Sequence, residues 1–268
     1  MITVIMAVYN GARFMDKAIA SVVAQTSPQW ELLIVDDGST DDSLDRASHW
    51  RELVNSHYSE EKIRVYSTGN SNSGPQVGRN IGAERARYDI FAYLDQDDLF
   101  FPRRIESIIP FFNEYDLVFA PYEIFEKERV NIWNIHAIWN KQSYVCSSEG
   151  ERDPTFDNWI HRFLGLVEIS VPLGAAHTRD IFNKAGGFQP QIVSGASGVL
   201  WRRMAERGAR IGYCPVIAGR YNVRPDSQAR TKRRFSIGGF ELQKDHPLGS
   251  NGQYLDEDWF AALELKNR

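Results

Sequence analysis

The sequence predicts an α/β fold in which a largely parallel β-sheet is flanked by helices. Short β-branched runs alternate with segments whose apolar residues recur at helical spacing. Turn-forming stretches such as "GSTDDS" and "SNSGPQ" separate the two kinds of segment. At 268 residues, 43% of them apolar and 25% charged, the chain is long enough for one large domain or two small ones.

The first half contains the clearest alternation of strands and helices. The expected strands are residues 2–8, 32–35, 63–66, 90–94 and 117–120. Apolar spacing predicts helices at 14–23 and 77–87. Ser39, with Asp42 three residues later, resembles a capping box for another helix. Pro102 suits the first turn of a fourth helix. The buried face of that fourth helix is expected to hold Ile105, Ile108, Ile109 and Phe112.

The pattern weakens after residue 127 and returns near residue 171. The weak part holds four aromatic residues among polar ones, Trp133, Trp139, Tyr144 and Trp159. Flat apolar rings can stack on the faces of a carbohydrate, but these rings are equally well explained as part of the core. The later part contains an apolar stretch at 171–176, a Gly-Gly-Phe turn at 186–188 and a helix expected at 199–207.

Composition excludes several classes of protein. A net charge of −4 argues against general nucleic-acid binding. Cys146 and Cys214 are far apart and outside any metal-binding spacing, which favours reduced thiols in a cytoplasmic protein. The start "MITVIMAVYN" lacks a basic leader and predicts a first strand, not a signal peptide. No run approaches the roughly 18 apolar residues of a membrane span.

Polar side chains follow three of the expected strands. The first strand ends at Val8-Tyr9-Asn10, the second at Asp36-Asp37 and the fourth at Asp95-Gln96-Asp97-Asp98. In open parallel sheets, ligands bind beyond the carboxyl ends of the strands. Asp36-Asp37 alone is equally well explained by a turn. The third cluster has no turn to explain its mutual repulsion, so we expect it to face a cation.

The chemistry of a divalent cation suits this third cluster. Mg²⁺ and Mn²⁺ prefer hard oxygen ligands, usually one or two protein carboxylates together with substrate phosphates. An Asp-x-Asp edge can place one carboxylate on a sugar hydroxyl and the other on a metal that holds a diphosphate. This arrangement favours a nucleotide-sugar donor, whose leaving diphosphate the metal stabilises.

Several motifs follow one another along the chain in a fixed order, namely "VIMAVYNGARFMDKAIASVVAQT", "WELLIVDDGSTDDS", "SGPQVGRNIGAERARYDIFAYLDQDD" and the later "GGF" before "LWRRMAERG". Together they resemble family 2 glycosyltransferases of the GT-A fold. The resemblance is dense over residues 2–110 and looser over 171–228. It implies a Rossmann-like sheet with a smaller acceptor-side region. It also implies transfer of a sugar from a UDP-, GDP- or TDP-sugar to a saccharide or lipid-linked acceptor, with Mn²⁺ or Mg²⁺.

The resemblance assigns roles by position. The residues implied to bind nucleotide are Ala7, Val8, Tyr9, Asn10, Asp37, Arg79 and Asp95. Among these, Asp37 is expected to read the base edge and Asp95 to take the ribose hydroxyls, while Arg79 lies near the base or diphosphate or is a solvated helix residue. Asp97 is the implied metal ligand. Asp36 and Asp98 are expected to support their loops.

One segment departs from the family's pattern. Inverting members carry an acidic pair after the Gly-Gly-Phe turn, where this chain has Ala196-Ser197. Residues 181–205 contain no Asp, Glu or His, and a serine hydroxyl alone is a poor proton acceptor. Either another residue is the base, the reaction retains configuration, or the protein is a non-catalytic nucleotide-sugar-binding or scaffold protein. The candidate bases are Asp153, Asp157, Glu168 and Asp180.

Basic residues gather near the end of the chain. They are Arg220, Arg224, Arg230, Lys232, Arg233 and Arg234. Arg224 cannot ligate a cation, but its guanidinium can bind a diphosphate. We expect residues 1–110 to form the nucleotide-sugar half of one domain, 111–225 its acceptor half, and 226–268 a tail. That tail would be a lid, a partner contact or a peripheral contact with the inner face of the membrane.

Other nucleotide-binding classes fit less well. A nicotinamide dehydrogenase needs Gly-x-Gly-x-x-Gly after the first strand, and "VYNGAR" lacks it. A nucleotidyltransferase would share the acidic edge but needs a glycine-rich loop near the start. A receiver domain would explain an Asp pair after a strand, but not 268 residues or the Asp-x-Asp edge.

Overall fold

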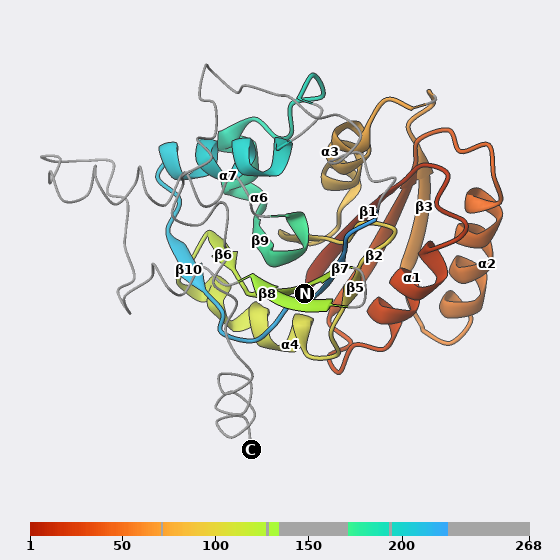
Figure 1. Ribbon diagram of the computed structural model, residues 1–268, viewed down its shortest axis with the longest axis horizontal. Coiled ribbons are helices and arrows are strands. Elements are labelled where there is room, and N and C mark those ends of the chain that lie inside the picture. Colours follow the sequence, from red (N-terminus) through yellow and green to blue (C-terminus); the bar gives the residue numbers. More distant parts are fainter. Residues whose placement is uncertain (71, 127–128, 134–170, 193–194, 225–268) are drawn as a thin grey trace, which may run out of the picture.

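Two β-sheets and the helices packed on them make up the described part of the chain (Figure 1). The structure, a computed structural model, describes residues 1–268 except 71, 127–128, 134–170, 193–194 and 225–268. None of its described helices is both long enough and apolar enough to cross a bilayer.

Seven strands form the large sheet. In spatial order they are β10 (Ile211–Tyr213), β6 (Leu117–Phe119), β9 (Ala175–Thr178), β4 (Ile90–Tyr93), β1 (Ile2–Val8), β2 (Trp30–Asp36) and β3 (Ile63–Ser67). Strand β9 runs antiparallel to β4 and β6, and every other neighbouring pair is parallel. The predicted largely parallel sheet is confirmed. The expected halves share this sheet, because β9 of the second half pairs directly with β4 of the first.

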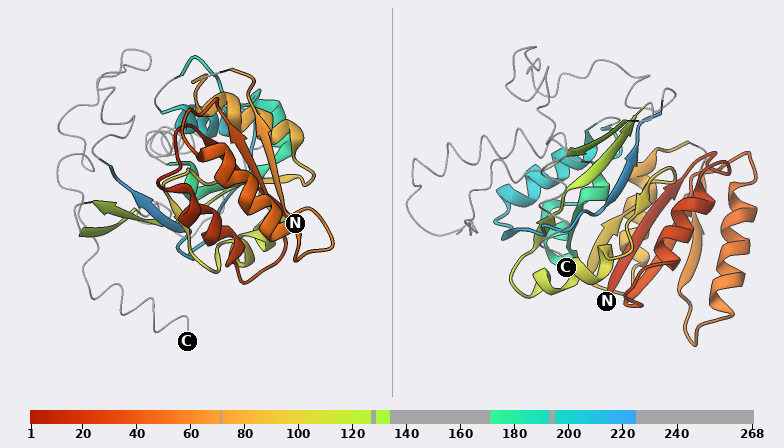
Figure 2. Two further views of the ribbon diagram at one scale, coloured as in Figure 1. Left: turned by 90° about the vertical axis from the view of Figure 1, so that its right-hand side faces the viewer. Right: turned by 60° about the horizontal axis from the view of Figure 1, so that its bottom comes forward.

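Helices cover both faces of the large sheet (Figure 2). They are α1 (Met15–Val23), α2 (Ser43–Asn55), α3 (Pro75–Arg85), α4 (Arg104–Ile108), α6 (Arg179–Ala185) and α7 (Ala196–Glu206). Side chains alternate across a strand, so Val4 and Met6 of β1 pack with α1, α2 and α4. Ile5 between them packs with α3, α6 and α7. Burial on both faces explains why the strands read as continuous apolar runs.

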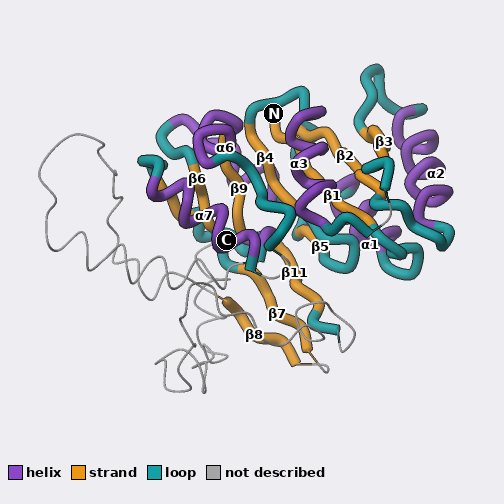
Figure 3. The backbone as a smooth tube through the Cα atoms, turned by 90° about the horizontal axis from the view of Figure 1, so that it is seen from above, coloured by secondary structure: helices purple, strands orange, loops and turns teal. Residues whose placement is uncertain are grey.

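A smaller sheet projects from the large one (Figure 3). Its strands are, in order, β5 (Leu99–Phe100), β11 (Gly219–Asn222), β7 (Tyr122–Glu126) and β8 (Arg129–Trp133). Strand β5 directly follows the acidic cluster and pairs antiparallel with β11. This pairing brings the chain beyond residue 219 next to the acidic cluster, although more than 120 residues separate the two in sequence.

Some sequence-based boundaries were wrong. Ser39 does not cap α2, because its hydroxyl accepts the backbone N–H of Asn10 at 2.9 Å, and the helix begins only at Ser43. The helix expected after Pro102 is short: α4 is followed by a 3₁₀ turn, η1 (Ile109–Asn113). The apolar stretch at 171–176 is a 3₁₀ turn, η3 (Pro172–Gly174), leading into β9.

Candidate functional site

A pocket of about 270 Å³ opens at the carboxyl ends of β1, β2 and β4. Its lining residues are Ala7, Val8, Tyr9, Asp37, Asn72, Gly74, Pro75, Arg79, Asp95, Gln96, Asp97, Tyr221 and Arg224. The structure therefore brings together all but one of the residues that the sequence assigned to nucleotide, diphosphate and metal. The residue left out is Asn10. Its side chain accepts the backbone N–H of Thr40 at 2.8 Å and so holds the loop after β2.

The two carboxylates that end β2 have different surroundings. Asp36 accepts the backbone N–H groups of Gly38 and Ser39, both at 3.1 Å, and therefore supports the loop as expected. Asp37 lines the pocket and accepts the Thr68 hydroxyl at 2.8 Å and the Gly74 N–H at 2.7 Å. These two bonds fix the Asp37 carboxylate at the pocket wall, where each oxygen still has a second lone pair for a ligand N–H.

Arg79 is a buried partner of the acidic cluster, not a solvated helix residue. Its side chain is 6% exposed, and its guanidinium donates to Asp95 Oδ1 at 2.6 Å. It also lies 5.3 Å from the centre of the Phe188 ring. Helix α3 comes close enough for these contacts because Gly82 packs against β1, where an added Cβ would lie 2.4 Å from Ile5 Cγ2.

Asp97 and Asp98 are both tied to the end of β11. The Asp97 carboxylate forms an ion pair with Arg224, with 2.8 Å between Oδ2 and Nε. The backbone N–H of Asn222 donates to Asp98 Oδ1 at 2.9 Å, and the Asn222 side chain donates to the Asp97 carbonyl at 2.5 Å. Burial, with the nearby charges of Asp95 and Asp97, raises the pKa of Asp98 well above its ordinary value. Asp98 thus supports its loop, as expected.

Five lining residues had no role assigned from the sequence, namely Asn72, Gly74, Pro75, Gln96 and Tyr221. Contrary to the expectation from the sequence, residues 95–98 form a turn in which the Asp98 N–H donates to the Asp95 carbonyl at 3.0 Å. The Gln96 side chain accepts the Tyr9 N–H at 3.0 Å and donates to the Tyr9 carbonyl at 3.1 Å, which fixes the end of β1 against this acidic turn. Tyr221 of β11 joins the lining, and burial together with the Asp98 charge raises its pKa to about 12. Only the packing of distant strands reveals either contact.

Helix α3 holds the backbone of the segment that begins at the Gly-Gly-Phe turn. Asn80 donates to the Phe188 carbonyl at 2.8 Å and accepts the Phe188 N–H at 2.9 Å. Gln76 donates to the Ile192 carbonyl at 2.7 Å. Ser197, in the first turn of α7, is buried at 7% exposure. The contacts between α3 and this segment therefore position backbone rather than an acidic side chain.

Of the four candidate bases, only Asp180 lies within the described residues. Asp153, Asp157 and Glu168 lie outside the described residues. Asp180 is on α6, directly after β9, and is an exposed partner of Lys184. Because β9 is antiparallel, Thr178 at its end pairs with Ile90 at the start of β4. Asp180 therefore lies at the edge of the sheet opposite the pocket and is too remote to act as the base there.

The acidic edge fits a divalent cation only together with a ligand. Within the described residues, no group of three or more His, Cys, Asp and Glu side chains could hold a metal ion by itself. Mg²⁺ and Mn²⁺ usually bind one or two protein carboxylates and complete their shell with substrate phosphates and water. Asp97 at the pocket can supply one such carboxylate, so this donor set fits a metal bound jointly with a diphosphate.

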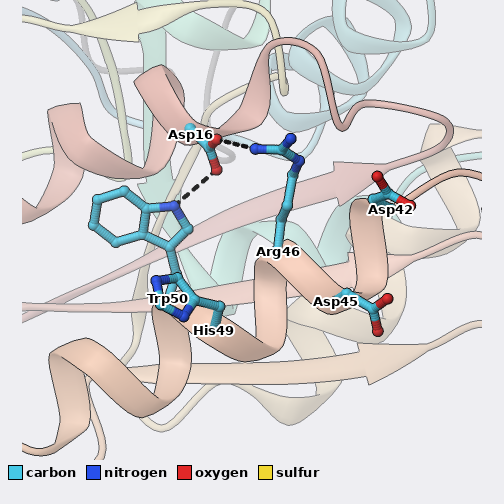
Figure 4. Close-up of a pocket in the computed structure, with 6 residues that line it drawn as sticks. All are labelled: Asp16, Asp42, Asp45, Arg46, His49 and Trp50. Carbon is cyan, nitrogen blue, oxygen red and sulfur yellow. Dashed lines mark hydrogen bonds and ion pairs between the residues drawn. The ribbon is translucent and has the colours of Figure 1, made fainter.

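A second groove lies on the surface between α1 and α2 (Figure 4). Its lining residues are Asp16, Asp42, Asp45, Arg46, His49 and Trp50. The Asp16 carboxylate already accepts the Trp50 indole N–H at 2.9 Å and pairs with Arg46 (Figure 4). This groove contains none of the residues that the sequence assigned to the site.

Comparison with known sequences finds matches that are described as glycosyltransferases. The family model described as "Glycosyl transferase family 2" matches residues 3–170, more than half of the chain. An uncharacterized glycosyltransferase of Rickettsia felis is 34% identical over 138 residues, which cover 51% of this chain and 21% of that protein. The putative teichuronic acid biosynthesis glycosyltransferase TuaG of Bacillus subtilis is 32% identical over 120 residues, 45% of each chain. The chain thus spans less than half the length of both relatives.

Solved structures share the fold at low sequence identity. S. aureus TarS 1–349 in complex with UDP-GlcNAc matches with a TM-score of 0.65 at 15% identity, covering 88% of this chain and 62% of that one. The mannosyltransferase PcManGT of Pyrobaculum calidifontis, in complex with GDP-Man and Mn²⁺, matches with a TM-score of 0.60 at 17% identity. That match covers 84% of this chain and 57% of the other. These two likenesses support the fold that was predicted from the sequence.

Proposed function

The chain belongs to glycosyl transferase family 2, and we propose that its pocket binds a nucleoside-diphosphate sugar and passes the sugar to a saccharide or lipid-linked acceptor. One observation carries this proposal: the carboxylates of Asp37, Asp95 and Asp97, from two separate strand ends, line a single pocket. Two neighbours of the same fold contain UDP-GlcNAc and GDP-Man, which supports a nucleotide-sugar donor here.

The contacts suggest how such a donor would lie. Asp37 is fixed at the wall formed by β2 and the 72–75 loop, where it can accept an N–H from a uracil or guanine edge. Asp95, oriented by Arg79, can accept ribose hydroxyls. Asp97 and Arg224 then remain for the diphosphate end, one through a divalent cation and the other directly.

The proposed cofactor is Mn²⁺ or Mg²⁺ with Asp97 as its protein ligand. When bound, the cation would supply positive charge to the leaving diphosphate. The residues of this chain would do the remaining work. Gln96 and Asp98 hold the acidic turn against β1 and β11, so Asp95 and Asp97 keep their positions when the donor arrives.

The proton of the acceptor hydroxyl needs another residue. Segment 181–205 has no carboxylate or imidazole, and Asp180 lies at the opposite edge of the sheet. We propose that the base is one of Asp153, Asp157 and Glu168. A retaining reaction, in which the leaving phosphate helps to take the proton, would need none of them. The buried Ala196-Ser197 pair also fits a protein that binds the nucleotide sugar without transferring it.

A binding screen tests the nucleotide site directly. We expect UDP, GDP, TDP or CDP with Mn²⁺ to stabilise the protein by about 2.7 kcal/mol at 100 times the dissociation constant. Calorimetric titration with no binding of any of the four would refute the proposal. Metal-dependent hydrolysis of the corresponding nucleotide sugar then separates an enzyme from a binding protein. NMR of the anomer of the transfer product separates an inverting enzyme from a retaining one.

A further inference from the structure

The guanidinium of Arg224 forms an ion pair with Asp97, the carboxylate that is proposed to bind the metal. The contact is partly buried, with side-chain exposures of 17% for Asp97 and 22% for Arg224. The guanidinium carbon also lies 4.2 Å from the centre of the Phe14 ring, at the start of α1. Arg224 is thus held at the mouth of the pocket by a charge contact and a cation–π contact.

The backbone around Arg224 is tied to the same acidic turn. Asn222, two residues earlier, bonds through its N–H to Asp98 and through its side chain to the Asp97 carbonyl. Val223 donates its N–H to the Phe125 carbonyl at 2.8 Å. The guanidinium can therefore change partner by side-chain rotation while its backbone stays beside Asp97.

Repulsion between the two positive charges limits when Arg224 and a divalent cation can both contact the Asp97 carboxylate. A guanidinium and a dication repel each other, so one carboxylate holds both poorly unless another anion lies nearby. A diphosphate is such an anion, and it offers the oxygen geometry that guanidinium groups bind in a bidentate manner. Arg224 would then move from the carboxylate to the phosphate and leave Asp97 to the cation.

We propose that Arg224 couples metal binding to nucleotide binding by competing with the cation for Asp97 until a diphosphate is present. This inference rests on the proposed function, because it takes Asp97 as the metal ligand and a nucleoside diphosphate as the ligand of the pocket. It assigns Arg224 a role that a metal-ligating side chain at the same place could not have. Loss of the guanidinium should therefore strengthen the binding of the cation alone and weaken the binding of the nucleotide.

The test compares Arg224→Gln with Arg220→Gln. Arg220 of β11, four residues before Arg224, is a matched control, since its Nε also lies 2.8 Å from a carboxylate, that of Glu123, and its side chain does not line the pocket. Mn²⁺ alone is titrated with electron paramagnetic resonance of the free ion. UDP and GDP are then titrated by calorimetry with and without Mn²⁺. Circular dichroism checks that each variant is folded.

In Arg224→Gln, the affinity for Mn²⁺ alone and the affinity for the nucleotide are expected to change in opposite directions. Its affinity for Mn²⁺ alone should rise about fivefold or more, the lower end of ordinary coupling between two sites. Its affinity for the nucleotide in saturating Mn²⁺ should fall about tenfold or more, because a charged hydrogen bond to phosphate is lost. Arg220→Gln should leave both within about twofold of wild type. Adding Asp97→Asn to Arg224→Gln should abolish the gain for Mn²⁺ alone.

The inference is overturned if Arg224→Gln leaves the Mn²⁺-alone affinity unchanged or lower, or if Arg220→Gln raises it equally. It is also overturned if Mn²⁺ binding stays undetectable in both wild type and Arg224→Gln. Failure of the proposed function looks different. In that case wild type binds neither UDP nor GDP, while the Mn²⁺-alone comparison still decides whether Arg224 competes for Asp97.

Discussion

The proposed donor side, around Asp95, and the proposed acceptor side, at residues 188–192, are built in contrasting ways, although helix α3 contacts both. On the donor side, α3 presents Arg79 to the carboxylate of Asp95. On the acceptor side, it presents Gln76 and Asn80 to backbone groups of Ile192 and Phe188. One side thus holds charged groups for a ligand, and the other holds the main chain in place. The contrast supports the proposal that the proton acceptor comes from elsewhere in the chain.

The largest expected effect is a loss of transfer when Asp97, on the proposed donor side, is changed. Asp97→Asn should reduce transfer by about 100-fold or more, because it removes the carboxylate proposed to hold the cation at the leaving diphosphate. It should also abolish the gain in nucleotide affinity that Mn²⁺ gives. Both are measured with a nucleotide sugar that carries the base identified in the binding screen.

Asp116→Asn is the matched control for that variant. Asp116 also accepts from an arginine, Arg210 at 2.9 Å, but it precedes β6 at the edge of the sheet opposite the pocket. Hydrogen bonds from Arg210 outweigh burial and lower the Asp116 pKa, so this change should cost stability and leave transfer per folded molecule near wild type. Equal metal dependence of nucleotide binding in wild type and Asp97→Asn would contradict the assignment.

A smaller effect concerns stability, where the buried imidazole of His177 packs against Phe182 of α6 and Trp201 of α7. His177 on β9 contacts the Thr178 carbonyl at 3.0 Å through Nδ1, which must donate, so Nε2 accepts from the Tyr93 hydroxyl at 2.8 Å. Burial lowers the His177 pKa from 6.5 to about 4. Between about pH 4 and pH 6.5 the unfolded chain therefore binds a proton on this imidazole that the folded chain does not bind.

The sign of the pH effect follows. The stabilising contribution of neutral His177 is complete above pH 6.5 and is lost as the pH falls towards 4. At pH 5 the loss should be about 2 kcal/mol of the free energy of unfolding. Urea denaturation at pH 5 and pH 8 should show a flatter dependence for His177→Gln, whereas the exposed-site variant His57→Gln should keep the wild-type slope. An unchanged slope in His177→Gln would contradict the assignment.

The smallest expected effect concerns Ser197, which occupies the place of the missing acid. Ser197→Ala should change transfer by less than about threefold, because a hydroxyl with no base beside it accepts protons poorly. Initial rates with the screened donor, normalised to folded protein by circular dichroism, are the measurement. A loss of about 100-fold with the fold intact would mean that this segment does supply the proton acceptor.

Sequence reasoning succeeded where local pattern and chemistry agreed. The apolar runs that formed β1, β2 and β4 predicted a shared edge, so the convergence of Asp37, Asp95 and Asp97 could be expected. The ion pair between Asp97 and Arg224 could not, because it depends on the pairing of β5 with β11. Those two strands are short and lack apolar alternation. The capping box at Ser39 was wrong because a distant N–H, that of Asn10, took its hydroxyl.

The antiparallel strand β9 has a consequence for the order in which the chain acquires structure. Until residues 175–178 pair with it, β4 presents one unpaired edge of strongly apolar sequence, Ile90–Tyr93. Such an edge is a template for intermolecular pairing. A truncated chain that ends after the first four parallel strands should therefore aggregate, even though it carries most of the pocket. A chain still emerging from the ribosome would face the same hazard until β9 has been synthesised.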